Sequence, residues 1–288
     1  MKLGLQIPSF SWPDAPASIG PTLGRVARAA EAAGYDSIWV MDHLFQIRSM
    51  GRYTEPMLEA YTALSFLAGV TSRVQLGAMV TAVTLRPPAV LVKQVTALDV
   101  LSGGRATLGI GAAWNAQEHM GLGIPFPPLA ERFERLEETL QIAHQMWRGD
   151  TRPFRGRHYQ LEEPVNSPPP LRVPHPPILI GGGGERKTLR LVAQYADAWN
   201  VFGFLPRAQL AHKLDVLREH CARLERDPAT IEKTALLTLD VEQGVDRLLR
   251  RLEGLAKLGF TTVIASHPDV DSLRAIDLVG NELLPRLG

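Results

Sequence analysis

The sequence has a single cysteine, almost no net charge and no long apolar run. Cys221 stands alone, which excludes an internal disulfide bond and argues against a thiolate metal cluster. Lys and Arg total 31 against 30 Asp and Glu, a net charge of +1, so neither nucleic acid nor an anionic membrane is an expected partner. No apolar run approaches the ~18 residues of a membrane span, and the N-terminal MKLGLQIPSF lacks the core of a signal peptide. We therefore expect a soluble, cytoplasmic protein.

What the sequence does have is an alternation of short apolar runs with longer stretches of helical spacing, which is typical of a parallel sheet. Eight runs are predicted strands: Lys2–Ile7, Ser37–Met41, Val74–Val80, Ala106–Ile110, Pro177–Ile180, Ala198–Phe202, Thr234–Leu239 and Thr261–Ala265. Eight strands, each followed by a helix, favour a closed (β/α)8 TIM barrel occupying residues 1–288 as one domain. The alternative, an open doubly wound sheet, needs a glycine-rich turn after the first strand, and none is present.

Helices are predicted from apolar residues at intervals of three or four. One helix carries Phe133, Leu136, Leu140, Ala143 and Trp147, and a second carries the apolar residues from Val245 to Ala256. Glu131 and Arg135 are spaced for an ion pair on the first of these. Gly34 and Gly103 are predicted to end two other helices, because glycine tolerates the left-handed conformation. Cys221 falls in a helical stretch, Leu210 to Leu224, and is interpreted as a packing residue.

Two proline-rich stretches interrupt the alternation, one after the fourth strand (Trp114 to Pro128) and one before the fifth (Asp150 to Pro177). Loops of this length in a compact domain are usually functional, and we expect both to cover the mouth of the barrel. In the second, Thr151–Phe154 and His158–Leu161 flank an Arg-Gly-Arg turn and are predicted to form a small hairpin.

Catalytic groups of such barrels come from the carboxyl ends of strands, and the second strand ends in Asp42 and His43. His43 is the catalytic candidate, because an imidazole can give or take a proton near neutral pH. Asp42 could orient the imidazole or cap the segment that follows. A loop histidine held by ordinary hydrogen bonds explains the same residues equally well.

The third and fourth strands are rich in glycine near their ends. Gly77 marks a place where the backbone bends or is closely approached. In the fourth strand, Gly109 and Gly111 form a Gly-x-Gly pair without the third glycine of a dinucleotide fingerprint. We expect a backbone surface open to a planar ring there, with Asn115 nearby as donor and acceptor.

The fifth predicted strand is followed by four glycines and then a helix: Gly181, Gly182, Gly183 and Gly184. They leave several backbone N–H groups unobstructed at the positive end of a helix dipole, with Arg186 and Lys187 adding charge. A flexible turn needs one glycine rather than four, so the run favours phosphate binding. A Walker-type NTPase site is excluded, because no Gly-Lys-Ser/Thr follows.

In this order, the segments resemble the bacterial-luciferase-like superfamily, and within it the branch that uses the deazaflavin coenzyme F420. The resemblance covers nearly the whole chain and is carried by Leu3-Gly4-Leu5-Gln6, Asp42-His43, the run from Leu98 to Arg105, Gly109-Ile110-Gly111, Trp114-Asn115 and Glu118. Its most specific element is Ser102-Gly103-Gly104-Arg105. It implies a (β/α)8 barrel with an insertion.

The resemblance also implies roles for individual residues. A non-proline cis peptide bond, matched here by Met79–Val80, supports the coenzyme ring from behind. His43 matches a histidine beside the redox ring, and Asn115 matches an asparagine that contacts the ring or the ribityl chain. The glycine run matches the phosphate cradle. The implied coenzyme contacts are Asp42, His43, Met79, Val80, Thr81, Gly111, Ala112, Asn115 and Gly181 to Gly184, with no metal.

One departure matters. Where the F420-dependent sugar-phosphate dehydrogenases have an acidic residue after the second glycine, this chain has Ala112, which argues against sugar-phosphate oxidation. We expect an F420-dependent oxidoreductase that moves a hydride to or from a small hydrophobic substrate, with His43 as proton partner. An FMN-dependent monooxygenase and a non-catalytic flavin-binding protein are the alternatives. We expect an apolar lining of Trp12, Phe45, Trp114 and Phe126, and a homodimer built on the second and third helices.

Overall fold

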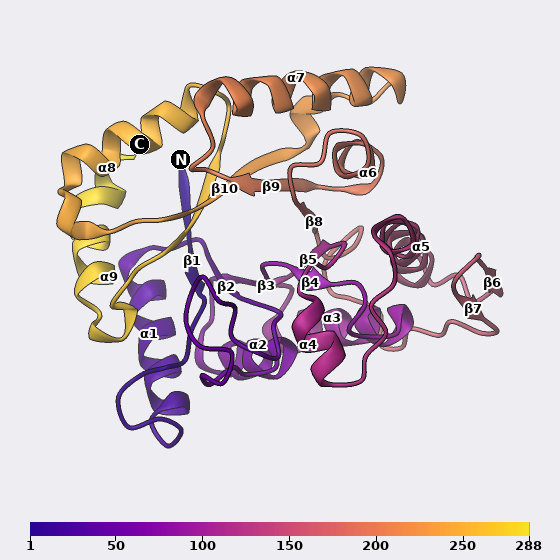
Figure 1. Cartoon of the computed structure of the whole chain (residues 1–288), viewed down its shortest axis with the longest axis horizontal. Helices are drawn as coiled ribbons and strands as arrows, with labels where there is room; N and C mark the ends of the chain where they lie inside the picture. The colour runs from indigo at the N-terminus through magenta and orange to yellow at the C-terminus, as the bar shows by residue number, and fades with distance from the viewer. Residues whose placement is uncertain (288) are drawn as a thin grey trace.

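Eight parallel strands close into a barrel within residues 1–287, the part of the chain that the computed structural model describes (Figure 1). The strands are β1 (Lys2–Ile7), β2 (Ser37–Val40), β3 (Gln75–Ala78), β5 (Ala106–Gly111), β8 (Ile178–Gly181), β9 (Ala198–Phe202), β10 (Glu232–Thr238) and β11 (Thr262–Ser266). They run in the order β3-β2-β1-β11-β10-β9-β8-β5, and a pairing between β3 and β5 closes the ring. All eight predicted strands are confirmed. The predicted third strand is interrupted, because the chain turns at Met79–Val80 and resumes as the short β4 (Thr81–Ala82).

Helices surround the barrel, and both amphipathic patterns identified in the sequence fall on helices. They are α1 (Ile19–Ala33), α2 (Ala60–Val70), α3 (Pro88–Ser102), α4 (Ala116–Gly121), α5 (Leu129–Trp147), α6 (Thr188–Tyr195), α7 (Arg207–Arg223), α8 (Val245–Ala256) and α9 (Arg274–Leu278). Gly34 ends α1 at φ +98° and Gly103 ends α3 at φ +73°, as predicted. Arg135 donates to Glu131 on α5 at 2.7 and 2.9 Å, and Cys221 is buried on α7. Among the described residues, no helix combines the length and the apolar character needed to cross a membrane.

The two proline-rich insertions differ from expectation. The first contains a helix, α4, that was predicted as irregular chain. The second forms the predicted hairpin from β6 (Phe154–Arg155) and β7 (Gln160–Leu161), which projects beside α5 in Figure 1. The backbone of this insertion is bound to helices on the outside of the barrel. Glu138 of α5 accepts hydrogen bonds from three of the insertion's amides, and Asp99 of α3 accepts from two others. The expectation that both insertions cover the barrel mouth is therefore wrong for the second.

Glycines let a tryptophan fill the barrel interior. Trp39 packs there with Met79, Leu179, Ala198 and Ile264. A Cβ on Gly77 would lie 2.5 Å from the Trp39 ring, and a Cβ on Gly109 would lie 2.0 Å from the carbonyl oxygen of Ala78. The close approach predicted at Gly77 is thus a packing contact. The surface of Gly109 predicted to be open is covered by the neighbouring strand.

The most specific motif of the sequence has a structural role. Arg105 is almost fully buried and donates to the carbonyl oxygens of Ala68, Thr71, Val74 and Ser102. Three of these carbonyls lie at the end of α2 and in the turn before β3, and the fourth belongs to Ser102, the last residue of α3. Carbonyls at helix ends have no partner within their own helix, and Arg105 supplies one. The Ser-Gly-Gly-Arg segment therefore fixes α2 and α3 around β3.

Candidate active site

A cavity of about 470 Å³ opens at the carboxyl ends of the strands. Most of the predicted coenzyme contacts line it: Asp42, His43, Met79, Val80, Thr81, Gly111, Ala112, Gly181, Gly182 and Gly184. Residues that were not predicted also line it, among them Glu118, Thr188, Asn200, Phe202 and Leu236, together with Leu129, Phe133 and Leu136 of α5. The volume falls in the range of small-molecule and cofactor sites.

The back wall of the cavity is built around Val80. The Met79–Val80 peptide bond is cis, as the resemblance implied. A Cβ on either Gly111 or Gly181 would lie 2.9 Å from a methyl carbon of Val80. The two glycines therefore admit the Val80 side chain between β5 and β8, and Val80 takes the space beside Gly111 that was predicted to be open for a planar ring.

His43 is held by a carboxylate, but not by the predicted one. Its Nδ1 lies 2.9 Å from Oε1 of Glu118, on α4, and the Trp114 ring packs edge-on against it at 5.4 Å between centroids. Glu118 Oε2 also accepts from the backbone N–H groups of Leu44 and Phe45. Burial raises the pKa of Glu118, but the hydrogen bonds from His43 and the two amides outweigh it and leave the pKa lowered. The carboxylate is therefore ionised at neutral pH.

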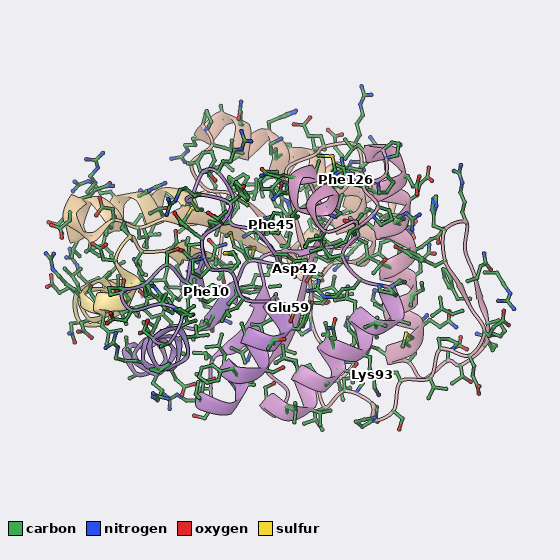
Figure 2. The ribbon with its side chains drawn as sticks, turned by 60° about the horizontal axis from the view of Figure 1, so that its bottom comes forward. Phe10, Asp42, Phe45, Glu59, Lys93 and Phe126 are labelled. Carbon is green, nitrogen blue, oxygen red and sulfur yellow. The ribbon has the colours of Figure 1, made fainter. Side chains whose placement is uncertain are left out.

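Asp42, labelled near the centre of Figure 2 beside Glu59, has a different partner. Both of its oxygens accept from Arg86 at 2.7 Å, and Oδ2 also accepts from the Ala82 amide at 3.0 Å. Burial lowers the pKa of Arg86, but its hydrogen bonds to Asp42 and Glu59 outweigh this and raise it. The prediction that Asp42 orients His43 or caps the next segment is wrong, because Asp42 anchors β4 instead.

Thr81 lines the cavity through the same anchored segment. Its hydroxyl shares a 2.8 Å hydrogen bond with the Tyr61 hydroxyl, and both residues are buried. Burial raises the pKa of Tyr61, so the phenol is neutral at neutral pH. Thr81 thus joins β4 to α2 as well as facing the cavity.

The glycine run between β8 and α6 presents backbone donors. Gly182 donates to Asn200 O, but the amides of residues 183–188 find no acceptor within the described part of the chain. Gly182 and Gly184 are exposed and line the cavity, as does Thr188, the first residue of α6. Gly183 does not line it, because its carbonyl is turned toward Lys213. We call Gly182, Gly184 and Thr188 the cradle.

Asn115 is not where the resemblance implied. Its side chain accepts from the amide of Gln117 and caps the N-terminus of α4, and it is absent from the cavity lining. The capping role follows from its sequence position, since Asn followed three residues later by Glu is a helix-start signal. The prediction that Asn115 contacts the coenzyme has no support in this arrangement.

Of the four aromatic residues predicted to line the cavity, Trp114 alone does so. Trp12 packs against Phe10, Phe45 against Tyr53, and Phe126 against His119. Figure 2 shows Phe10, Phe45 and Phe126 at separate places on the molecule. The apolar lining comes instead from α5 and from the ends of β9 and β10, where Phe202 and Leu236 lie.

Within the described residues, no group of three or more His, Cys, Asp or Glu side chains is placed to hold a metal ion. The titratable side chains that line the cavity are Asp42, His43 and Glu118. Asp42 is bound to Arg86 and Glu118 to His43. His43 is thus the group through which the site can exchange a proton.

Comparison with known proteins identifies the family. A family model described as luciferase-like monooxygenase matches residues 1–271. An F420-dependent glucose-6-phosphate dehydrogenase of Kineococcus radiotolerans is 37% identical over 260 residues, covering 88% of this chain and 75% of that protein.

Two solved structures have the same fold at low identity. The coenzyme F420-dependent tetrahydromethanopterin reductase of Methanopyrus kandleri matches with a TM-score of 0.82 at 17% identity, over 100% of this chain and 99% of that one. The monooxygenase RslO1 of Streptomyces bottropensis matches with a TM-score of 0.79 at 18% identity, over the full length of both chains.

Proposed function

This chain belongs to the luciferase-like monooxygenase family, and from that premise we propose that it is an F420-dependent oxidoreductase acting on a small hydrophobic organic molecule. One observation carries the proposal: the cradle and His43 line the same cavity. The cradle suits the phosphate of a coenzyme, and His43 suits proton exchange with a substrate. The similarity to a relative named as F420-dependent supports the choice of coenzyme.

The residues present fit such a coenzyme. Successive unpaired amides at the start of a helix, with the Thr188 hydroxyl beside them, form an anion site of the kind that binds phosphate. Lys187 and Arg186 are exposed nearby and add positive charge. Val80 would lie against the ring. When bound, the coenzyme supplies the hydride donor or acceptor.

The protein's own contribution is proton transfer and exclusion of water. His43 faces the cavity with its side chain only 13% exposed. Because Ala112 offers no carboxyl group, His43 is the group that gives or takes the proton accompanying hydride transfer. The Trp114 ring packs edge-on against it.

The remaining wall indicates the substrate class. Leu129, Phe133, Phe202 and Leu236 are apolar, and none offers a charge to a sugar phosphate. At the rim, Phe202 and Phe204 stack with centroids 5.0 Å apart while both remain more than half exposed. An exposed pair of stacked rings beside a cavity is typical of a binding surface for a planar apolar molecule.

An FMN-dependent monooxygenase is the second candidate, since the cradle would accept its phosphate equally and RslO1 shares the fold. Titration of the purified protein with F420 and, separately, with FMN distinguishes them through coenzyme fluorescence. Binding of F420 supports the proposal, and tight FMN binding without F420 binding overturns it. If the protein only binds a flavin and has no catalytic role, His43→Ala should leave coenzyme binding and any activity unchanged.

The cradle is tested by a pair of glycine variants. Gly182 and Gly259 both have positive φ, +125° and +95°, so alanine strains the backbone at either position. Only Gly182→Ala places a methyl group in the cradle. We expect similar losses of thermal stability, but a coenzyme affinity reduced about 10- to 100-fold in Gly182→Ala alone. Equal affinities would place the phosphate elsewhere.

We also propose that the protein acts as a homodimer. Neighbouring helices α2 and α3 expose Phe66, Val90 and Leu101, the last of them 71% exposed. Burying such residues against a second copy would stabilise the assembly. Light scattering of the wild type and of Leu101→Glu tests this, and a monomeric wild type would refute it.

A further inference from the structure

We propose that Glu118 is a positioning residue that holds His43 in its Nδ1–H tautomer, so that Nε2 is the nitrogen that meets the substrate. The inference rests on the proposed function for its catalytic meaning, but its structural content stands on the contacts alone. It concerns a carboxylate on α4 and an imidazole that follows β2, two segments that are distant in the sequence.

The contacts of Glu118 leave one protonation pattern for the imidazole. An ionised carboxylate only accepts hydrogen bonds. Its Oε1 lies 2.9 Å from Nδ1 of His43, so Nδ1 must carry a proton there. Its Oε2 is occupied by the amides of Leu44 at 2.9 Å and Phe45 at 3.5 Å. The Glu118 side chain is 1% exposed, so water does not compete for these bonds.

The other ring nitrogen of His43, Nε2, is available to exchange a proton with a substrate. Nε2 of His43 has no hydrogen-bond partner among residues 1–287, and His43 lines the cavity. With a proton fixed on Nδ1, neutral Nε2 is a proton acceptor, and the protonated ring is a donor at the same atom. Both directions of transfer therefore use one atom in one orientation.

Within the described residues, no other carboxylate forms a hydrogen bond with His43. Asp42 precedes His43 directly but is bound to Arg86 and Ala82. Glu118 bridges His43 and the two following amides at once, so it fixes the loop after β2 as well as the ring. Its own position depends on the Asn115 cap at the start of α4.

The chain contains a matched comparison pair. On α5, Glu134 lies 2.7 Å from Nε2 of His158, whereas the carboxylate facing Nδ1, that of Glu131, lies 3.9 Å away, beyond hydrogen-bond distance. His158 and Glu134 do not line the cavity. The two pairs thus predict opposite tautomers within one protein.

The experiment is NMR of the full-length protein with ¹⁵N-labelled histidine at neutral pH, read through the ring nitrogen shifts and their couplings to ring protons. His43 is assigned by the signals missing from His43→Gln. We expect His43 with its proton on Nδ1 and His158 with its proton on Nε2. In Glu118→Gln, His43 is expected to change tautomer or to populate both, while Glu134→Gln leaves the His43 signals unchanged.

Two results would overturn the proposal: a wild-type His43 protonated on Nε2 alone, or a Glu118→Gln spectrum that matches the wild type. If Glu118→Gln does not fold, the wild-type tautomer decides by itself. With bound coenzyme and a turned-over substrate, Glu118→Gln should lower kcat by about 10- to 100-fold with little change in coenzyme affinity. Failure of coenzyme binding in the wild type would refute the proposed function but not the tautomer.

Discussion

Replacing Arg86 by methionine should destabilise the barrel mouth strongly, because it leaves a buried carboxylate without its counter-charge. The Asp42 side chain is 0% exposed and that of Arg86 is 11% exposed, and two 2.7 Å hydrogen bonds join them. Breaking a buried ion pair by removing one partner typically costs about 3–5 kcal/mol. For a domain of this size, such a loss lowers the melting temperature by on the order of 10 °C.

The charge itself is tested by the double variant. Asp42→Asn in the Arg86→Met background removes the buried charge and keeps an acceptor for the Ala82 amide, which holds β4. We expect the double variant to be more stable than Arg86→Met, with a coupling of about 0.5–3 kcal/mol in the thermodynamic cycle. Differential scanning fluorimetry of the four proteins measures it.

Arg155→Met is the matched control. Arg155 also makes a two-pronged ion pair, with Glu162 on the hairpin, but both side chains are more than half exposed. We expect its melting temperature to equal that of the wild type, since surface pairs contribute little. The reasoning is refuted if Arg86→Met melts at the same temperature as this control. It is also refuted if the double variant loses as much stability as Arg86→Met and Asp42→Asn lose together.

Two further predictions concern acid stability and the substrate wall. Burial lowers the pKa of His144 and of His267 in the folded protein, so these histidines bind a proton more readily in the unfolded chain. Their contribution to the free energy of unfolding is therefore fully present above their ordinary pKa of 6.5 and is lost as the pH falls below it. The melting temperature should therefore fall from about pH 7 to pH 5, and less steeply in His144→Gln/His267→Gln; parallel curves would contradict this. Alanine at Phe202 should weaken binding of anilinonaphthalene sulfonate, a dye whose aromatic rings bind apolar surfaces, about 10-fold by fluorescence. Val173→Ala, on the second insertion, should not, and an equal effect of both would argue against the aromatic rim.

The fold was predictable because its signals are local. Each barrel strand is a short apolar run bounded by helical spacing, and each run could be identified without knowing its partner. A local signal of the same kind marks the start of α4, where Asn115 and Glu118 have the spacing of a capping box. That signal predicts both the helix and the capping role of Asn115, which was instead assigned to the coenzyme.

The site was predictable only in part, because its decisive contacts join distant positions. His43 and Asp42 were found from their place after β2, but Glu118 is 75 positions from His43 and Arg86 is 44 from Asp42. No period or spacing reports such pairs. A buried strand-end carboxylate does require a cation or several donors, so the need for a partner to Asp42 was visible in the sequence, although its identity was not.

The contact of Val80 with Gly111 and Gly181 means that the back wall can change only as a set. Enlarging either glycine requires a smaller residue at position 80, because a Cβ at position 111 or 181 would lie 2.9 Å from a methyl carbon of Val80. Directed evolution that samples single positions would therefore leave this part of the cavity wall unchanged. Libraries that vary positions 80, 111 and 181 together are needed to reshape the wall around Val80.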